Sequence, residues 1–407
     1  MASILTVNVG SSSIKFGLFE AQPRPDGDLP ASLRGEIGNL GGAPQVSVVD
    51  ADGQPVQPGP ASGSSLGHPL EALMPWLEER IGTEQLLAVG HRVVFGGLDF
   101  TAPTRIDSSV LARLRALIPF APLHQPVDIA PIDWLARRHP RLLQVACFDS
   151  AFHRAMPQVA QRYGLPSALH DAGARRYGFH GLSYEYVAAR LREIDPAAAA
   201  GRAIVAHLGS GASLCALRAG ASVATTMGFS ALSGVMMATR PGELDPGIVI
   251  WLLRERGMTV NDVESLLYHD CGLKGVSGMG SDLRALLASD DARAVLATQL
   301  FVYRIVREIG SLAAALDGLD ALVFTAGIGE NAAAVRASVA AACGWLGVEL
   351  DPGANDRPPR RAHGAALIST AASRVRVWII PTDEEQVIAR HALRVSQTAG
   401  ATTRRAT

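Results

Sequence analysis

Apolar and polar positions alternate from Ser3 to Glu20, and one run of glycine and serine, within the sequence VNVGSSSIK, interrupts the alternation. Alternation with a period of two is typical of a strand that buries one face. A short Gly/Ser break between two such runs is typical of a tight turn. The pattern therefore predicts two strands joined by a hairpin at the start of the chain.

The stretch Ala203–Gly220 repeats this layout two hundred residues later. Its sequence, AIVAHLGSGASLCALRAG, again leads from an apolar strand through a turn of small residues into a second strand. The individual residues match weakly, and it is the spacing that agrees. Two similar hairpins in one chain indicate a duplicated domain.

Strands and helices alternate through the second half of the chain, which favours an α/β fold. LDALVFTAGIGEN predicts a buried strand, a glycine turn and a helix that continues to Ala342. VRVWIIPTDEEQVIARHAL predicts a strand ended by Pro381 and a helix from Thr382. The Pro-, Gly- and Ser-rich residues between Ala21 and Pro69 predict loops and edge hairpins.

Length and composition narrow the class of protein. The chain has 407 residues, more than the ~250–300 at which a single core stops growing, so two domains are expected. A content of 48% apolar and 18% charged residues is typical of a soluble globular protein. The net charge of −1 provides no field to attract nucleic acid. No apolar run approaches the ~20 residues that span a bilayer, and no signal sequence is evident. We expect no nucleic-acid or membrane partner.

The four cysteines stand singly, with neither the paired spacing of a zinc site nor a disulfide framework, and predict reduced thiols in a cytoplasmic protein. Of 37 basic residues only two are lysines, Lys15 and Lys274. Where Arg is otherwise preferred, a retained Lys suggests a need for its compact charge. Lys15 follows the Gly/Ser turn, whose serines either bind phosphate or cap their own backbone.

Three further residues carry candidate chemistry. Arg92 stands among apolar residues near the end of a predicted strand, where it either grips an anion or forms a structural salt bridge. Asp149 follows the apolar strand LLQVACF, a common place for a metal or catalytic group and also for a turn. His180 precedes a helix that Ser183 can cap, and a structural core histidine is the alternative.

Later segments add candidates that also have simpler explanations. Arg240 precedes a Pro-Gly turn where its guanidinium can reach a ligand. The segment GMGSDLR begins a helix that Ser281 can cap. In PTDEE, a capping box from Thr382 to Glu385 accounts for Glu385 and leaves Glu384 as a candidate metal ligand.

Taken in order from Asn8 to Glu384, these segments resemble the acetate kinase family. The segments that carry the resemblance are NVGSSSIK, HRVVFGG, FDSAFH, RRYGFHGLS, HLGSGAS, MGFSALSGVMMATRPGELDP, SDLR, FTAGIGEN and IPTDEE. The resemblance implies an α/β fold of two duplicated ribonuclease H-like domains with a nucleotide cleft between them. The implied N-terminal domain is 1–150 plus 385–407, and the implied nucleotide-binding and dimerisation domain is 151–384. ATP/ADP, Mg²⁺ or Mn²⁺, a cytoplasmic location and a homodimer are also implied.

The same resemblance assigns roles residue by residue. The implied catalytic residues are Asp149, His180, Arg240 and Arg92, and the implied metal residues are Asn8 and Glu384. The expected nucleotide contacts are Lys15, Ser11, Ser13, His207, Leu208, Gly209, Ser210, Gly211, Asp282, Leu283, Arg284, Gly327, Ile328, Gly329, Glu330 and Asn331. The expected acyl pocket is Arg92, Val94, Leu123, Phe179 and Ala231.

The implied reaction moves the ATP γ-phosphoryl group to acetate. A carboxylic acid with a pKa of ~4–5 is an anion at pH 7 and attacks phosphorus without a general base. The reaction instead needs positive charge, which we expect from Arg92, Arg240, protonated His180 and Mg²⁺. Asp149 is then expected to orient the metal or its water rather than to act as a base.

Four positions depart from the family pattern: Ser210, Ala224, Ala231 and Ser233. Ala231 in place of a pocket proline leaves space, so propionate is expected to be accepted alongside acetate, and a propionate kinase is the alternative enzyme. An actin- or chaperone-like ATPase is the alternative outside metabolism. Arg92, His180 and Arg240 favour the kinase, because a hydrolase needs no clamp for a carboxylate. TAGIGEN favours ATP over pyrophosphate.

Overall fold

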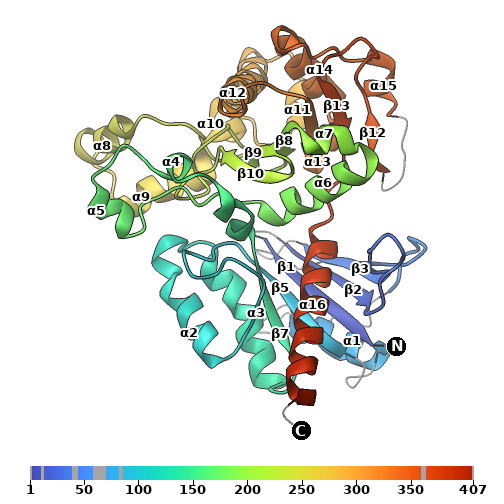
Figure 1. The fold of residues 1–407 in the computed structure, drawn as a ribbon. Coiled ribbons are helices and arrows are strands. Elements are labelled where there is room, and N and C mark those ends of the chain that lie inside the picture. The colour runs from blue at the N-terminus through green and yellow to red at the C-terminus, as the bar shows by residue number, and fades with distance from the viewer. Residues whose placement is uncertain are drawn as a thin grey trace. The chain divides into compact units, whose positions relative to one another are not determined.

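The computed structural model describes residues 2–10, 13–38, 45–57, 70–81, 86–358 and 364–405. Its contacts divide the chain into two compact units (Figure 1). Unit 1 comprises Met1–Ala151 and Asp383–Thr407, and unit 2 comprises Phe152–Thr382. Each unit is built on a sheet of its own.

The sheet of unit 1 has seven strands in the order β4-β3-β2-β1-β5-β7-β6. The strands are β1(Ser3–Val9), β2(Ile14–Glu20), β3(Ala31–Gly38), β4(Gln45–Asp50), β5(Leu86–Val93), β6(Thr104–Arg105) and β7(Gln144–Phe148). β1 pairs antiparallel with β2 and parallel with β5, and β5 pairs parallel with β7. The hairpin predicted for the first twenty residues is confirmed, and β3 and β4 form the expected edge hairpin.

Helices cover both faces of this sheet. They are α1(Leu70–Ile81), α2(Ser108–Ala116), α3(Gln125–Arg138) and α16(Glu384–Arg405), with a 3-10 turn η2(Ile118–Phe120). Val7 of β1 shares one apolar cluster with Leu77 of α1 and Leu135 of α3. Gly90 of β5 faces α16 instead, and a Cβ atom there would lie 2.5 Å from Ile388. The alternation of β1 and β5 thus places α1 and α3 on one face and α16 on the other.

Unit 2 has a six-stranded sheet in the order β10-β9-β8-β11-β13-β12. The strands are β8(Arg202–Leu208), β9(Ala212–Arg218), β10(Ala221–Thr225), β11(Ala321–Thr325), β12(Ala366–Leu367) and β13(Arg376–Ile379). β8, β9 and β10 are antiparallel, β8, β11 and β13 are parallel, and β12 is antiparallel to β13. The second predicted hairpin is β8–β9.

The two sheets are copies of one arrangement. With β4 set aside, the order β3-β2-β1-β5-β7-β6 matches β10-β9-β8-β11-β13-β12, and every corresponding pair runs in the same relative direction. Three antiparallel strands followed by two parallel ones is the ribonuclease H-like pattern. The predicted duplicated α/β fold is therefore confirmed.

Helices also flank the sheet of unit 2. They are α4(Gln158–Gln161), α5(Ser167–Asp171), α6(Gly181–Ile194), α7(Pro196–Ala200), α8(Pro246–Glu255), α9(Val260–Ser265), α10(Gly272–Ser277), α11(Leu283–Leu287), α12(Ala292–Leu316), α13(Ala326–Asn331), α14(Ala333–Ala342) and α15(Pro352–Asp356), with a short π-helix η4(Leu266–Asp270) and a 3-10 turn η5(Gly344–Leu346). The 3-10 helix η3(Asp149–Ala155) begins in unit 1 and ends in unit 2. Val187 of α6 packs in a cluster with Val205 of β8, and α12 packs against β8, β9 and β10.

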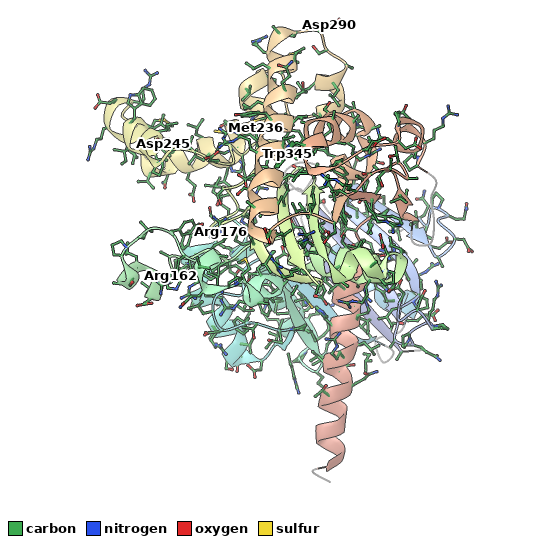
Figure 2. All side chains as sticks on the ribbon, turned by 45° about the horizontal axis from the view of Figure 1, so that its top comes forward. Arg162, Arg176, Met236, Asp245, Asp290 and Trp345 are labelled. Carbon is green, nitrogen blue, oxygen red and sulfur yellow. The ribbon has the colours of Figure 1, made fainter. Side chains whose placement is uncertain are left out.

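Helix α8 projects from the sheet of unit 2, and Asp245 caps its first turn (Figure 2). Its apolar side chains Ile248, Ile250, Trp251 and Leu253 are exposed, with half of the Trp251 surface accessible. Among the described residues, no helix is both long and apolar enough to cross a membrane.

Candidate active site

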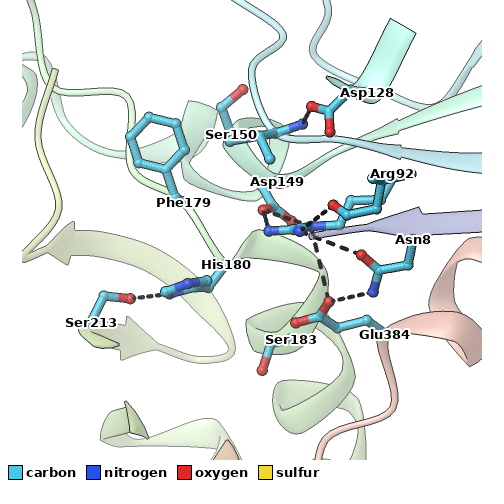
Figure 3. Close-up of polar contacts among 12 residues, drawn as sticks. Asn8, Arg92, Asp128, Asp149, Ser150, Phe179, His180, Ser183, Ser213 and Glu384 are labelled. Atoms are coloured by element: carbon cyan, nitrogen blue, oxygen red, sulfur yellow. Dashed lines mark hydrogen bonds and ion pairs between the residues drawn. The ribbon is translucent and has the colours of Figure 1, made fainter. Parts of the chain in front are cut away.

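Four predicted site residues of unit 1 lie at one edge of its sheet. Asn8 is next to the last residue of β1, Arg92 is next to the last residue of β5, and Asp149 directly follows β7. These strands are parallel, so their carboxyl ends meet at one edge. Glu384, the first residue of α16, joins them there (Figure 3).

The Arg92 guanidinium connects the members of this group (Figure 3). Its Nη2 and Nε atoms donate to Oδ2 of Asp149 at 2.6 and 3.1 Å. Among the described residues, the contacts of Nη1 are long, 3.4 Å to Oδ1 of Asn8 and 3.5 Å to the carbonyl of Val9. Arg92 therefore forms the salt bridge that was one of its two interpretations, and Nη1 remains weakly engaged.

The side-chain amide of Asn8 links the sheet to α16. Its Nδ2 donates to Oε2 of Glu384 and to Oε1 of Glu385, each at 3.0 Å. Oε2 of Glu384 also lies 4.0 Å from Nε of Arg92. One amide and one guanidinium thus hold three carboxylates, counting Asp149.

Burial and charge shift the titration of this cluster. Burial opposes the charge on Arg92, but the carboxylates of Asp149 and Glu384 outweigh it and raise the pKa of the guanidinium. Burial raises the pKa of Glu384 to about 7, against the lowering effect of Arg92. Burial likewise raises the pKa of Asp128, whose Oδ2 accepts the N–H of Val94, to about 7. The cluster holds more acid groups than its single cation neutralises.

Oxygen atoms suited to a magnesium ion gather in the same place. Oδ1 of Asp149 is buried and has no hydrogen-bond partner among the described residues, and the carboxylates of Glu384 and Glu385 meet at Asn8. Mg²⁺ prefers oxygen ligands and usually combines one or two carboxylates with substrate phosphates. Within the described ranges, no group of three or more His, Cys, Asp or Glu residues could hold a metal alone. The donor set fits a magnesium ion whose remaining ligands would be nucleotide phosphate oxygens and water.

Lys15 lies beside this cluster but makes different contacts. It stands opposite Asn8 in the β1–β2 ladder and lines a cavity of about 260 Å³ with Arg34, Glu36 and Glu385. Lys274, the other lysine, pairs with Asp270 at 2.7 Å. No ion pair or hydrogen bond engages the Lys15 ammonium in the part of the chain that the structure describes. Its contact with a nucleotide phosphate stays a prediction.

The turn between β1 and β2 is closed by its backbone. The N–H of Gly10 donates to the carbonyl of Ser13 at 2.8 Å. Ser11, also predicted to bind the nucleotide, lies outside the described residues. The hairpin itself is confirmed, and the phosphate contacts of both serines stay predictions.

The predicted acyl-pocket residues are divided between the units. Val94 of unit 1 is buried, while Leu123 of the same unit is 39% exposed. Phe179 and Ala231 belong to unit 2 and are buried. A pocket that combines all four stays a prediction.

His180 of unit 2 has an unusual backbone and close ring contacts. Its φ of 58° lies in the left-handed region, which few residues other than glycine adopt. Its Nδ1 lies 2.8 Å from Oγ of Ser213, and its ring stacks on that of His207 with centroids 4.2 Å apart. Nδ1 of His207 in turn lies 2.8 Å from Oγ of Ser183. Unit 2 thus brings two predicted site residues, His180 and His207, face to face.

Arg240 approaches the same region from a different loop. A Cβ atom built on Gly211 would lie 2.9 Å from Nη2 of Arg240 and 3.4 Å from Nε2 of His180. Nη1 of Arg240 donates to the carbonyl of Ala231 at 2.9 Å. A guanidinium and an imidazole therefore converge on the glycine that ends the β8–β9 turn.

A cavity of about 820 Å³ in unit 2 is lined by all three segments predicted to bind the nucleotide. This volume falls within the range of ~300–1,000 Å³ that is usual for small-molecule sites. The predicted residues on its wall are Gly209, Ser210, Asp282, Leu283, Arg284, Gly327, Ile328 and Asn331. The rest of the wall is formed by Ala238, Ser281, Leu287, Ala288 and residues 332–334.

Other members of the predicted nucleotide segments do not line this cavity. Leu208 is buried in β8. The carbonyl of Gly329 accepts a hydrogen bond from Nη1 of the buried Arg336 at 2.9 Å. Oε1 of Glu330 accepts the N–H of Thr382 at 3.3 Å. Contacts of these three residues with a nucleotide stay predictions.

Comparison with protein families gives the assignment. The model of the acetokinase family matches residues 3–390. The chain belongs to the acetokinase family. The resemblance carried by the sequence segments is thereby confirmed, and membership makes the chain a phosphotransferase.

Similar members of the family cover nearly the whole chain. An acetate kinase of Rhodopseudomonas palustris (strain TIE-1) is 52% identical over 395 residues, which is 97% of this chain and 98% of the relative. An acetate kinase of Rhizobium meliloti is 49% identical over 396 residues, again 97% and 98% of the two chains.

Solved structures agree with the fold. The structure of Porphyromonas gingivalis acetate kinase matches with a TM-score of 0.83 and 33% identity, and the match covers 97% of this chain and 100% of that kinase. A propionate kinase from Francisella tularensis subsp. tularensis SCHU S4 has a TM-score of 0.85 and the same identity and coverage. The duplicated architecture is thus shared with acetokinase-family enzymes.

Three predictions about helix caps were wrong. Ser281 does not cap α11, because Asp282 is the N-cap of that helix and its Oδ1 accepts the N–H of Arg284 at 3.0 Å. Oγ1 of Thr382 is buried without a partner among the described residues, and Asp383 instead accepts the N–H of Gln386 at 3.0 Å. The predicted capping box is therefore absent, and α16 begins at Glu384. Ser183 does not cap α6, because its hydroxyl binds His207. The hydrogen bond in each case is made by a carboxylate, of Asp282 or Asp383, or by the imidazole of His207.

Sequence analysis missed several residues that touch the predicted site. Glu385 was assigned to the capping box, yet it accepts from Asn8. Asp128 lies within a helical segment with no motif, and Ser213 was seen only as part of the second hairpin turn. Only for Ser213 did a signal exist, since it occupies the position of Lys15 in the repeated hairpin.

Proposed function

We propose that the protein transfers the γ-phosphoryl group of ATP to acetate, reversibly and with Mg²⁺, giving acetyl phosphate and ADP. The observation that carries the proposal is the convergence of Arg240 and His180 on Gly211, in the loop whose Gly209 and Ser210 line the 820 Å³ cavity. This arrangement supports a nucleotide in the cavity with its terminal phosphate beside two nitrogen donors.

The acceptor needs little activation. Acetate is ionised at pH 7, so its oxygen is already a nucleophile and no base has to remove a proton. The obstacle is repulsion between two anions. Nη1 of Arg92, whose contacts within the described ranges are the long ones to Asn8 and Val9, is the donor proposed to bind the acetate carboxylate.

Phosphoryl transfer depends on positioning and on charge around the equatorial oxygens. Arg240 supplies a permanent cation and His180 an N–H donor, and neither has to lose a proton during the reaction. Because the carbonyl of Ala231 and the hydroxyl of Ser213 hold these two side chains, their donors are oriented before the substrate binds. We propose both as stabilisers of the transition state.

The carboxylates of unit 1 are proposed to hold the magnesium ion. Asn8 and Glu384 are the proposed ligands or water-holding groups, and Oδ1 of Asp149 is available to orient them. When bound, the ion neutralises phosphate charge and brings the nucleotide phosphates into register with the acceptor. Asp149 remains paired with Arg92, so a role as general base is not proposed for it.

Acetate is the proposed substrate because the relatives at 46–52% identity are named acetate kinases. The expectation that Ala231 admits propionate as well stays a prediction for the same assay. We expect kcat/KM for propionate to lie within a factor of about ten of that for acetate.

We also propose a cytoplasmic homodimer. The four cysteines form no disulfide, which suits a reducing compartment where ATP is present. The exposed apolar side chains of α8, led by Trp251, support a surface covered by a second copy. Light scattering should report a dimer, and Trp251→Glu should shift it toward monomer.

The decisive assay traps acyl phosphate. Incubation with ATP, Mg²⁺, acetate and hydroxylamine should yield acetohydroxamate, and Arg240→Ala should lower kcat about 10³-fold with little change in KM. Arg293→Ala, which removes an exposed guanidinium paired with Asp291, is the matched control and should behave as wild type. ATP hydrolysis without hydroxamate would favour the actin- or chaperone-like alternative. A normal kcat for Arg240→Ala would refute the electrostatic mechanism.

A further inference from the structure

The hydroxyl of Ser213 lies between the ring of His180 and a buried phenol. Oγ of Ser213 is 2.8 Å from Nδ1 of His180 and 2.5 Å from the hydroxyl of Tyr184 (Figure 3 shows the first contact). Ser213 and Tyr184 are both fully buried. The hydrogen bonds to His180 and Tyr184 fix the direction in which the buried Ser213 hydroxyl points.

The backbone of His180 is fixed as firmly as its ring. Nε2 of the buried His153 lies 2.9 Å from the carbonyl of Phe179, which precedes His180. The carbonyl of His180 accepts the N–H of Tyr184 at 3.1 Å. A left-handed residue persists only where its surroundings hold it. The position of Nε2, on the side of Gly211, is therefore set by the fold.

The positions of the protons in the hydrogen bonds from Tyr184 through Ser213 to His180 follow from the chemistry of the three groups. A phenol is a stronger acid than an aliphatic hydroxyl, and hence the better donor, so Tyr184 donates to Oγ of Ser213. The single proton of Ser213 is then directed at Nδ1 of His180. Neutral imidazole carries one proton, and with Nδ1 accepting, that proton belongs on Nε2. Two hydroxyls thereby select one tautomer.

The other groups around His180 in unit 2 are consistent with a donor at Nε2. The ring of His207 stacks on it, the Arg240 guanidinium approaches Gly211 beside it, and the ring of His153 meets Tyr184 edge-on. His207 offers its ring face and no acceptor in this stack. The contact at Nδ1 is made by the hydroxyl of Ser213, which in turn meets the phenol of Tyr184.

We propose that Ser213, oriented by Tyr184, is a positioning residue that holds His180 in the Nε2–H form. The proposal rests on the function proposed above, in which His180 donates to the transferring phosphoryl group. With Ser213 present, Nε2 carries a proton whether the ring is neutral or cationic. His180 thus remains a donor when pH rises above the ordinary histidine pKa of about 6.5.

Ser213→Ala separates tautomer selection from simple packing. A cationic ring carries both protons without help, and a larger fraction of rings is cationic at pH 5.5 than at pH 8.5, so kcat should fall less than about tenfold at pH 5.5. At pH 8.5 the neutral ring can place its proton on Nδ1, and kcat should fall about 100-fold, as for loss of one transition-state donor. KM for ATP and acetate should change less than threefold. Tyr184→Phe should show the same trend with about a tenfold loss at pH 8.5.

Ser277→Ala is the matched control. Ser277 is also a fully buried serine of unit 2, on α10, and its hydroxyl lies 3.2 Å from the carbonyl of Gly280 and accepts the N–H of Met279 at 3.1 Å, so the variant removes hydrogen bonds to backbone groups rather than to a histidine ring. Its loss should lower kcat by the same small factor at both pH values. If Ser213→Ala also loses the same factor at pH 5.5 and 8.5, or loses nothing, the proposal is overturned.

A measurement that needs no catalytic turnover tests the tautomer of His180 independently of the proposed function. Nitrogen-15 NMR of labelled protein at pH 8.5 should show His180 protonated on Nε2 in wild type and a mixture of tautomers in Ser213→Ala. A wild-type His180 protonated on Nδ1 would refute the proposal even if the enzyme makes acyl phosphate. Absence of acyl phosphate with the expected NMR result would instead refute only the function.

Discussion

The duplicated hairpins carry different chemistry at equivalent positions. In each unit one residue is next to the last in the first strand, one stands opposite it on the second strand, and one stands beside it on the parallel strand. These positions are Asn8, Lys15 and Arg92 in unit 1, where Arg92 follows His91, the partner of Val7, and His207, Ser213 and Thr325 in unit 2. An amide and two cations in one copy correspond to an imidazole and two hydroxyls in the other.

The difference shows how one backbone serves two tasks. Unit 1 gathers three carboxylates around one guanidinium and keeps two acid groups with pKa values near 7, Asp128 and Glu384. Unit 2 builds its site from hydroxyls, imidazoles and small residues, which line a cavity and orient donors. Charge in unit 1 is expected to lower stability, whereas the groups of unit 2 are expected to be nearly neutral to it.

The largest effect should come from removing the cation of unit 1. Arg92→Ala leaves Asp149 fully buried and unpaired, so the free energy of unfolding should fall by about 3–5 kcal/mol and kcat by about 10³-fold. Arg240→Ala, in unit 2, should lose as much activity but less stability, because Nη1 of Arg240 binds the carbonyl of Ala231 rather than a fully buried carboxylate. Denaturant unfolding and steady-state kinetics measure both.

A double variant tests the cause of this contrast. Adding Asp149→Asn to Arg92→Ala removes the unpaired charge, so it should restore stability without restoring kcat. Equal losses of stability in the two single variants would contradict the difference between the units.

The next effect is a gain in stability. The folded-state pKa of Asp128, about 7, exceeds its ordinary value of ~3.9, so the folded protein holds a proton that the unfolded chain releases. Stability contributed by this group is therefore lost as pH rises from about 4 to 7. Asp128→Asn should match wild type at pH 4 and be more stable by about 4 kcal/mol at pH 8.

Asp107 of the same unit has a pKa shifted in the opposite direction, so its effect on stability has the opposite pH dependence. Its hydrogen bonds to Val110 and Ser109 lower its pKa, so its stabilising contribution is lost as pH falls through that value. Asp107→Asn should consequently cost most at neutral pH. The same pH trend in both variants would show that burial of Asp128 is not the cause.

A smaller effect separates the two lysines. Lys15→Ala should raise KM for ATP about tenfold, the loss expected for one charge-assisted contact, with no change in stability. Lys274→Ala removes an exposed pair with Asp270 and should change neither. Equal kinetics for the two variants would remove Lys15 from the nucleotide site.

The smallest effect compares two buried threonines. Oγ1 of Thr325 has no partner in the described part of the chain, whereas Oγ1 of Thr6 donates to the carbonyl of Gly17 at 3.3 Å. Thr325→Val should therefore stabilise unit 2 by about 1 kcal/mol, and Thr6→Val should destabilise unit 1 by a similar amount. Thermal unfolding distinguishes them, and a loss of stability in Thr325→Val would indicate a hidden partner.

Much of the fold follows from short-range patterns. The alternation around VNVGSSSIK and AIVAHLGSGAS predicts both hairpins, and their likeness predicts the duplication. Contacts between distant residues follow no such pattern. The carboxylate of Glu385 satisfied a local capping rule, yet it binds Asn8, 377 residues away. Asp128 and Tyr184 lie on helices whose sequences show only which face is apolar.

The site was predicted in its residue types rather than in its pairings. The salt-bridge interpretation of Arg92 is confirmed by its pairing with Asp149, and the clamp on an anion stays a prediction. The partner of His180 was not predicted, since a serine in a Gly/Ser turn is locally explained by the turn. The family resemblance names residues, and their hydrogen bonds come from the three-dimensional structure.

The helix α16 has a consequence for the order of synthesis. Unit 1 begins with the first residues of the chain, yet its sheet is covered by a helix that starts at Glu384. On the ribosome, all of residues 152–382 emerge before that helix does, so unit 2 is able to fold while unit 1 still exposes the apolar face around Gly90. The amino-terminal half of this enzyme is thus the last to be finished.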